Sequence, residues 1–165
     1  MHATCATTRE QYWYSSYITQ PMEQDIHILT SEAVGLLKEM IAIPSPSFGE
    51  DEVCSHICRW LSDRGLTFER IGSNIILESW RQEDASTVRP HSVIMLCAHI
   101  DTVTAGTDYS FDPYEPDYVK AEEVIGSRLG KPLTAEEIVA GLGSNDDGAS
   151  VVSMIAAFRH FCSRK

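Results

Sequence analysis

Apolar residues recur at spacings of three and four in several stretches of the chain, and this pattern predicts amphipathic helices. One such stretch begins at Ser31, and we expect its helix to end before Pro44. Proline ends a helix because it lacks an N–H and its ring clashes with the preceding turn. A shorter helix is expected at Val119–Arg128. Another covers Ala149–Cys162 and gathers five residues on one face: Val151, Met154, Ile155, Phe158 and Cys162.

Ser47 and Glu50 have the spacing of a capping box, in which the two side chains bond free N–H groups at the start of a helix. We therefore expect a helix to begin here and to end at Gly65, because glycine commonly follows the last helical turn. Its buried face should consist of four apolar residues: Val53, Ile57, Trp60 and Leu61.

The region after this helix has the pattern of strands. Short strands are expected at Thr67–Arg70 and Asn74–Glu78, with a turn at residues 72–73 between them. Ser92–Ala98 is almost wholly apolar, which is typical of a strand buried on both faces in a mostly parallel sheet. Ile138–Ala140 is expected to be a strand, although the capping-box spacing of Thr134–Glu137 leaves a helix open.

The order of helices and strands indicates an α/β fold. Residues 1–25 show no clear period, and we expect a poorly ordered leader there, while residues 26–165 would form one domain. Residues 82–90 are expected to be a polar loop.

Composition excludes several classes of function. The net charge of −11 would repel phosphate backbones, so we expect no nucleic-acid partner. The chain has neither an apolar run long enough to cross a membrane nor a secretory signal in its first residues, so we expect no membrane partner and a cytoplasmic protein. The five cysteines are odd in number and lack CxxC spacing, so we expect no disulfide framework and reduced thiols.

His99 and Asp101 follow the apolar run 93–98, and in an open α/β sheet sites form where strands end. Alternate residues of an extended chain lie on the same side, so Asp101 can orient a metal-binding His99. A solvated histidine followed by a turn aspartate remains an equal alternative for this motif.

The segment Gly141–Gly148 contains two glycines that permit a tight turn, followed by Asp146 and Asp147 at the start of an apolar helix. A carboxylate here could be shared by two cations, which two-metal hydrolases hold about 3.5–4 Å apart. The alternative is a helix cap, in which the carboxylate bonds N–H groups of the first turn.

Four motifs together give the chain a family resemblance. They are Ile43-Pro44-Ser45 with Gly49-Glu50, Ala98-His99-Ile100-Asp101-Thr102-Val103, Phe111-Asp112-Pro113-Tyr114 and Gly141–Gly148. In this order they resemble the N-terminal portion of the co-catalytic zinc amidohydrolases and peptidases, which include acetylornithine deacetylase, succinyl-diaminopimelate desuccinylase and carboxypeptidase G. The resemblance covers residues 31–163. Related zinc aminopeptidases are an alternative, but the Ile-Pro-Ser turn favours the deacetylase and carboxypeptidase branch.

The resemblance implies a three-layer phosphorylase/hydrolase-like zinc-peptidase domain with a mostly parallel central sheet, truncated on its C-terminal side. It implies hydrolysis of an amide bond in an N-acyl amino acid or peptide, most similar to acetylornithine deacetylase, an enzyme of amino-acid biosynthesis. It also implies two divalent ions, zinc or cobalt. His99 and Asp146 would be metal ligands, Asp101 would belong to the catalytic machinery by orienting His99, and the Asp146–Asp147 peptide would be cis.

The chain departs from the family pattern in two places. Residues 117–136 contain an insertion. The family's Glu-Glu pair, further carboxylate and histidine ligands, and the smaller domain through which the family often dimerises have no counterpart in residues 1–165. We therefore expect a chain that carries part of an active site and is inactive alone, or a non-catalytic remnant that acts as an interaction module.

Overall fold

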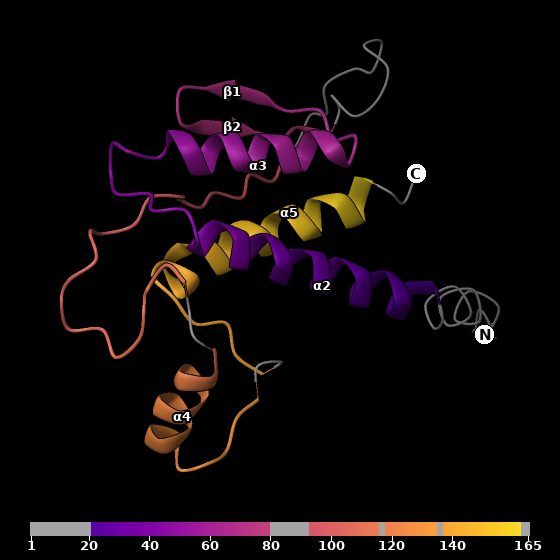
Figure 1. Cartoon of the computed structure of the whole chain (residues 1–165). Coiled ribbons are helices and arrows are strands. Elements are labelled where there is room, and N and C mark those ends of the chain that lie inside the picture. Colours follow the sequence, from indigo (N-terminus) through magenta and orange to yellow (C-terminus); the bar gives the residue numbers. More distant parts are fainter. Residues whose placement is uncertain (1–20, 80–92, 116–117, 135–136, 163–165) are drawn as a thin grey trace, which may run out of the picture.

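The computed structural model describes residues 21–79, 93–115, 118–134 and 137–162 (Figure 1). Most of the expected leader and the expected polar loop at 82–90 lie outside these residues. The first described helix, α2, spans Pro21–Ile41. It therefore begins well before Ser31, and residues 21–25, which we assigned to the leader, belong to it.

Helices α2 and α5 pack side by side and form the centre of the molecule (Figure 1). Helix α5 spans Ala149–Cys162, as its apolar spacing predicts. Burial of apolar surface is the main stabilising contribution here. The residues buried between α2, α3 and α5 are Leu36, Leu37, Met40, Ile41, Val53, Ile57, Trp60, Leu61, Val151, Val152 and Ile155.

Helix α3 spans Asp51–Asp63, and the four apolar residues expected on its inner face are all buried. It ends before Gly65 as predicted, and the N–H of Leu66 bonds the carbonyl of Leu61 at 3.0 Å. Its beginning differs from the capping-box prediction. Glu50 is the N-cap and makes no side-chain capping bond to the helix, and the hydroxyl of Ser47 bonds a distant residue instead.

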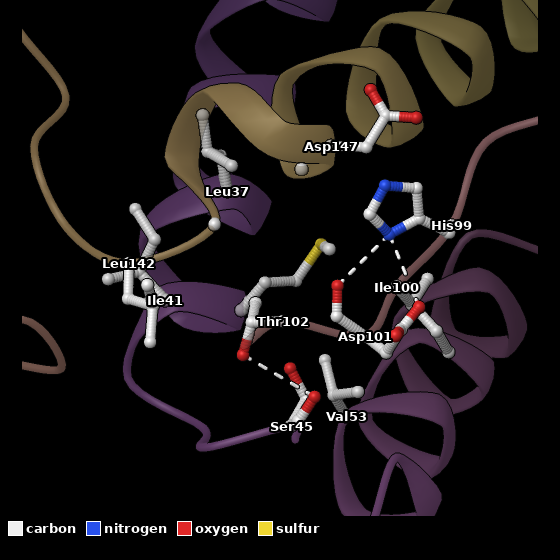
Figure 2. A pocket seen from close by; sticks show the side chains of 13 residues that line it. Leu37, Ile41, Ser45, Val53, His99, Ile100, Asp101, Thr102, Leu142 and Asp147 are labelled. Carbon is white, nitrogen blue, oxygen red and sulfur yellow. Dashed lines mark hydrogen bonds and ion pairs between the residues drawn. The ribbon is translucent and has the colours of Figure 1, made fainter. Parts of the chain in front are cut away.

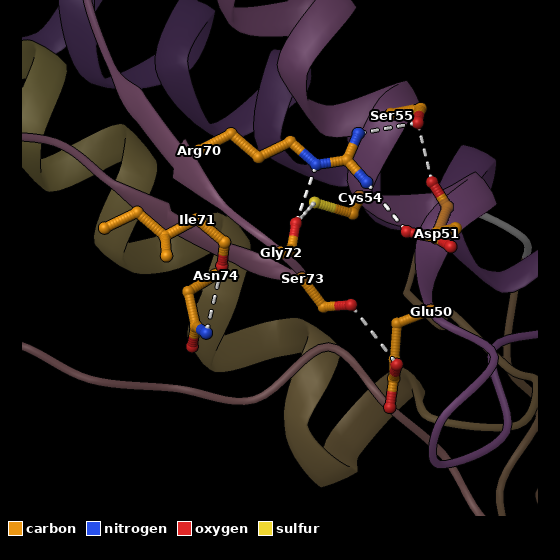
Figure 3. A network of polar contacts seen from close by, with 9 residues as sticks. All are labelled: Glu50, Asp51, Cys54, Ser55, Arg70, Ile71, Gly72, Ser73 and Asn74. Atoms are coloured by element: carbon orange, nitrogen blue, oxygen red, sulfur yellow. Dashed lines mark hydrogen bonds and ion pairs between the residues drawn. The ribbon is translucent and has the colours of Figure 1, made fainter.

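The described residues contain one sheet, an antiparallel hairpin of β1 (Glu69–Ile71) and β2 (Asn74–Ile76). Arg70 fixes this hairpin to the start of α3, as Figure 3 shows. Its guanidinium donates hydrogen bonds to the carbonyl of Gly72, the hydroxyl of Ser55 and the carboxylate of Asp51, at 2.8, 2.8 and 2.9 Å. The guanidinium is suited to this arrangement because it presents several donors in a fixed plane.

The apolar run 93–98 forms neither a helix nor a strand, and it pairs with no strand among the described residues. Val93, Ile94, Met95 and Leu96 are exposed, so the expectation of a strand buried on both faces is wrong within the described structure. The physical reason is that a buried strand needs neighbouring strands to bond its N–H and carbonyl groups, and none of the described residues supplies them.

Helix α4 spans Tyr118–Leu129, close to its predicted range. Ile138–Ala140 is irregular, so neither the strand nor the helix considered there forms. Glu137 does accept a hydrogen bond from the N–H of Thr134 at 2.9 Å, which is one half of a capping box.

No described helix has the length and apolarity that a membrane crossing requires.

Candidate metal centre

His99 and Asp101 lie on a short extended segment that the loop after α2 holds in place. The N–H of Thr102 donates to the carbonyl of Ser45 at 2.8 Å, and an isolated parallel bridge pairs Pro46 with Thr102. Ala98 and Ile100 pack against the core from this segment. Since side chains alternate along an extended backbone, His99 and Asp101 lie together on the opposite side, as the sequence predicts.

Both nitrogens of the His99 ring have an oxygen partner. Nδ1 lies 3.0 Å from the carbonyl oxygen of Asp101 and 3.2 Å from its Oδ1, and both contacts are drawn in Figure 2. Nε2 lies 3.0 Å from Oδ1 of Asp146, which is 47 positions away in the sequence. The structure thus brings together the three residues that the sequence analysis assigned to the site.

Two glycines shape the loop that carries Asp146. Gly143 has φ +76°, and a Cβ there would lie 2.5 Å from Cγ2 of Thr102. Gly148 is buried, and a Cβ there would lie 2.7 Å from both the Gly143 carbonyl oxygen and Cδ1 of Leu37. Both distances are shorter than side chains tolerate, so the loop packs this closely against the His99 segment and α2 only with glycine at these positions.

The Asp146–Asp147 peptide bond is cis, the form that the family resemblance implies for it. Both residues have non-helical backbone angles, and α5 begins after them at Ala149. Gly143 stands at the N-cap of this short turn, where no side chain makes a capping hydrogen bond. The carboxylate of Asp146 instead lies 3.0 Å from Nε2 of His99.

A cavity of ≈ 20 Å³ lies beneath these residues, with room for about one water molecule. Apolar side chains such as Leu37 and Val53 line it together with polar residues (Figure 2): Ser45, His99, Asp101, Thr102 and Asp147. Polar groups beside apolar side chains are typical of ligand-binding sites.

The pKa values of the site residues shift in the directions that favour a charged pair. Partial burial lowers the pKa of His99, but bonds to the Asp101 carbonyl and the Asp146 carboxylate outweigh it and raise that pKa above its usual value. The Ser47 hydroxyl, more than any other group, holds the pKa of the Asp101 carboxyl below its usual value. Without a cation, the site therefore favours a protonated His99 ring, which donates to the Asp101 carbonyl and to the Asp146 carboxylate.

The geometry of His99 and Asp146 also fits two ligands of one divalent cation. A tetrahedral ion that bound a nitrogen and an oxygen at its usual distances would hold the two atoms roughly 3.3 Å apart. Nε2 of His99 and Oδ1 of Asp146 are 3.0 Å apart. The described residues contain no cluster of three or more His, Cys, Asp or Glu side chains that could hold a metal ion. His99 and Asp146 therefore fit part of a metal-ligand set and do not form a complete one.

Sequence reasoning missed one member of this site. The hydroxyl of Ser47 donates a 2.6 Å hydrogen bond to Oδ2 of Asp101, across 54 positions of the sequence. The spacing of Ser47 and Glu50 indicated a local role instead. No local sequence pattern identifies this contact, because its two residues are 54 positions apart.

Comparison with known proteins supports a peptidase-like origin at most. No family model matches the chain. The chain is 29% identical over 164 residues to a protein described as a probable carboxypeptidase from Paracoccidioides brasiliensis strain Pb03. The match covers 91% of this chain and 34% of the relative, so the chain spans about a third of that protein's length.

Proposed function

We propose that the chain carries part of the active site of a metal-dependent hydrolase, which cleaves an amide bond in a peptide or an N-acyl amino acid. The observation that carries this proposal is the 3.0 Å contact between Nε2 of His99 and Oδ1 of Asp146. The similarity to a probable carboxypeptidase supports the same class of reaction.

Each residue of the site has a role in this proposal. His99 binds one cation through Nε2, and Asp101 orients the ring through Nδ1. Asp146 would be the second residue to hold a divalent cation, zinc or cobalt, and its side chain is 90% exposed, so its second oxygen would also be accessible to an ion. When bound, divalent ions would supply Lewis-acid chemistry, lowering the pKa of a bound water and polarising a substrate carbonyl.

We further propose that the chain is the N-terminal part of a three-layer α/β zinc-peptidase domain. The run 93–98, whose residues 93–97 are exposed, would then be a central strand, paired with strands from a longer polypeptide. The same polypeptide would supply the remaining ligands and a glutamate general base. The greater length of the similar carboxypeptidase supports this view. Within the class we favour a small substrate of the acetylornithine deacetylase type, on the motif resemblance alone.

Reading the transcript beyond codon 165 and expressing the longest product tests this proposal. We expect a Glu-Glu motif downstream and hydrolysis of an N-acyl amino acid or a dipeptide. A chelator should abolish this activity, and His99→Ala should lower it by roughly a hundredfold or more because it removes a ligand. Ser62→Ala, on the exposed side of α3, is the matched control and should retain activity. Ordinary turnover by the 165-residue chain alone would contradict the proposal.

A second candidate function is a non-catalytic interaction module. The exposed side chains of Val93, Ile94, Met95 and Leu96 favour it, because an unpaired apolar strand readily accepts another strand. The transcript separates the two functions. A stop codon directly after Lys165 in the mature message would support the module, and a downstream ligand motif would support the hydrolase.

A further inference from the structure

The hydroxyl of Ser47 donates a short hydrogen bond to the Asp101 carboxylate, which also faces His99. It lies 2.6 Å from Oδ2 of Asp101, while Oδ1 of the same carboxylate lies 3.2 Å from Nδ1 of His99. One oxygen of Asp101 thus faces the serine and the other faces the histidine. A carboxylate fixed at one oxygen loses the freedom to rotate, so its second oxygen keeps its direction.

The backbone on either side of Ser47 is itself held. On one side, the bridge between Pro46 and Thr102 ties the loop to the segment that contains Asp101. On the other side, the N–H of Phe48 donates to Oε1 of Glu50 at 2.6 Å, and Oε2 of Glu50 accepts from the hydroxyl of Ser73 at 3.4 Å. The serine is therefore attached both to the site and to the hairpin beyond α3.

Phe48 makes this loop unusual. Its φ is +70°, a conformation that side chains rarely adopt, and its ring is fully exposed. The loop gains no burial from this residue. The conformation instead accompanies a tight turn, in which the N–H of Gly49 bonds the carbonyl of Pro46 at 2.7 Å and the Ser47 side chain is directed at Asp101.

We propose that Ser47 is a positioning residue of the metal centre. By fixing the Asp101 carboxylate, it selects the form of the His99 ring in which Nδ1 carries the proton and Nε2 carries none. A neutral imidazole carries one N–H, and here both nitrogens face oxygen acceptors. A fixed Asp101 keeps the proton on Nδ1, and Nε2 is then the unprotonated nitrogen that a cation requires. This inference rests on the proposed function.

Two isosteric variants isolate the hydroxyl. Ser47 is exposed, so both Ser47→Thr and Ser47→Val should fit, and they differ only in the hydrogen-bond donor. Nitrogen NMR of the metal-free chain, in mildly alkaline solution where the ring is neutral, shows which nitrogen of His99 carries the proton. We expect the Nδ1–H form to dominate in the wild type and in Ser47→Thr, and the Nε2–H form to increase in Ser47→Val.

Ser62→Ala is the control, because the hydroxyl of Ser62 makes a single bond to the carbonyl of Cys58 on α3, away from the site. It should leave the His99 ring signals unchanged. An unchanged ring form in a folded Ser47→Val chain would overturn the proposal, and so would an equal shift in Ser47→Thr. This readout needs no metal, so it remains decisive if the chain binds none.

Zinc titration of the same variants gives the second readout. Loss of a group that orients a metal ligand weakens metal binding by about 10- to 100-fold. We expect Ser47→Val to weaken zinc binding by about tenfold, because Ser47 acts on His99 only through Asp101. Absence of zinc binding in the wild type would count against the proposed function and leave the ring-form result standing. Equal affinities of the Thr and Val variants for zinc would contradict the role of Ser47.

Discussion

Single residues decide how closely the loop of Asp146 approaches His99. Gly143 combines a positive φ with a neighbour, Thr102, that leaves no space for a Cβ. Gly35 is a useful contrast, because it lies inside α2 with a helical backbone and nothing within 4 Å of a Cβ. The same substitution should therefore have opposite effects at the two positions.

We predict that Gly143→Ala lowers the free energy of unfolding by roughly 1–3 kcal/mol, through backbone strain and overpacking against Thr102. Gly35→Ala should raise it by about 0.5–1 kcal/mol, because alanine is the better helix former. Denaturant unfolding followed by circular dichroism measures both. A Gly143→Ala chain as stable as the wild type would show that the loop can move away from Thr102.

The candidate site was predictable at the level of single residues where the signal was local. His99 and Asp101 are two positions apart at the end of an apolar run, so alternation places them on one side. The motif resemblance indicated Asp146. Ser47 could not be assigned in this way, because its partner is 54 positions away and its spacing to Glu50 resembled that of a helix cap.

At the scale of elements, an ionic cluster joins the helices at the end remote from the site. Glu32 on α2 accepts hydrogen bonds from Arg64, just after α3, and from Arg159 on α5. The guanidinium of Arg64 also lies over the Trp60 ring, 3.5 Å from its centroid, in a cation–π contact. Burial raises the pKa of the Glu32 carboxyl, but the two arginines outweigh burial and the pKa is lowered overall.

This lowered pKa gives Glu32 a stabilising effect that depends on pH. The effect is complete above the unfolded-state pKa of the carboxyl and is lost as the pH falls through the lower folded-state value. We predict that Glu32→Gln costs about 1 kcal/mol at neutral pH. The difference between the two chains should shrink in acid, as unfolding midpoints at several pH values would show. Glu122→Gln on α4 is the control, and a constant difference at every pH would contradict the prediction.

The helices could be predicted better than the strands, for a physical reason. The spacing of apolar residues in α3 and α5 reports the helix period directly, and their hydrogen bonds are formed within each element. A strand depends on neighbours elsewhere in the chain. The run 93–98 has the composition of a buried strand, yet no described residue pairs with it. Composition indicates what a strand needs and does not show whether the partner is present.

At the scale of the whole molecule, a helical core supports a site that fits only part of a ligand set. The core of α2, α3 and α5 holds the 98–102 segment and the 141–148 loop together, and so places His99 beside Asp146. The exposed residues 93–97 lead directly into the 98–102 segment. We propose that a longer polypeptide supplies both the strands that pair with this run and the metal ligands that complete the set begun by His99 and Asp146.

A zinc titration of the 165-residue chain, followed by NMR of the His99 ring, tests the central claim most directly. The claim is that His99 and Asp146 bind one cation together. Zinc should shift the Nε2 signal of His99, and Asp146→Asn should weaken this response by roughly tenfold or more. Asp63→Asn, at the end of α3, should leave it unchanged. The account would be contradicted if zinc left the Nε2 signal of His99 unchanged, or if it shifted that signal equally in the wild type and in the Asp146→Asn chain.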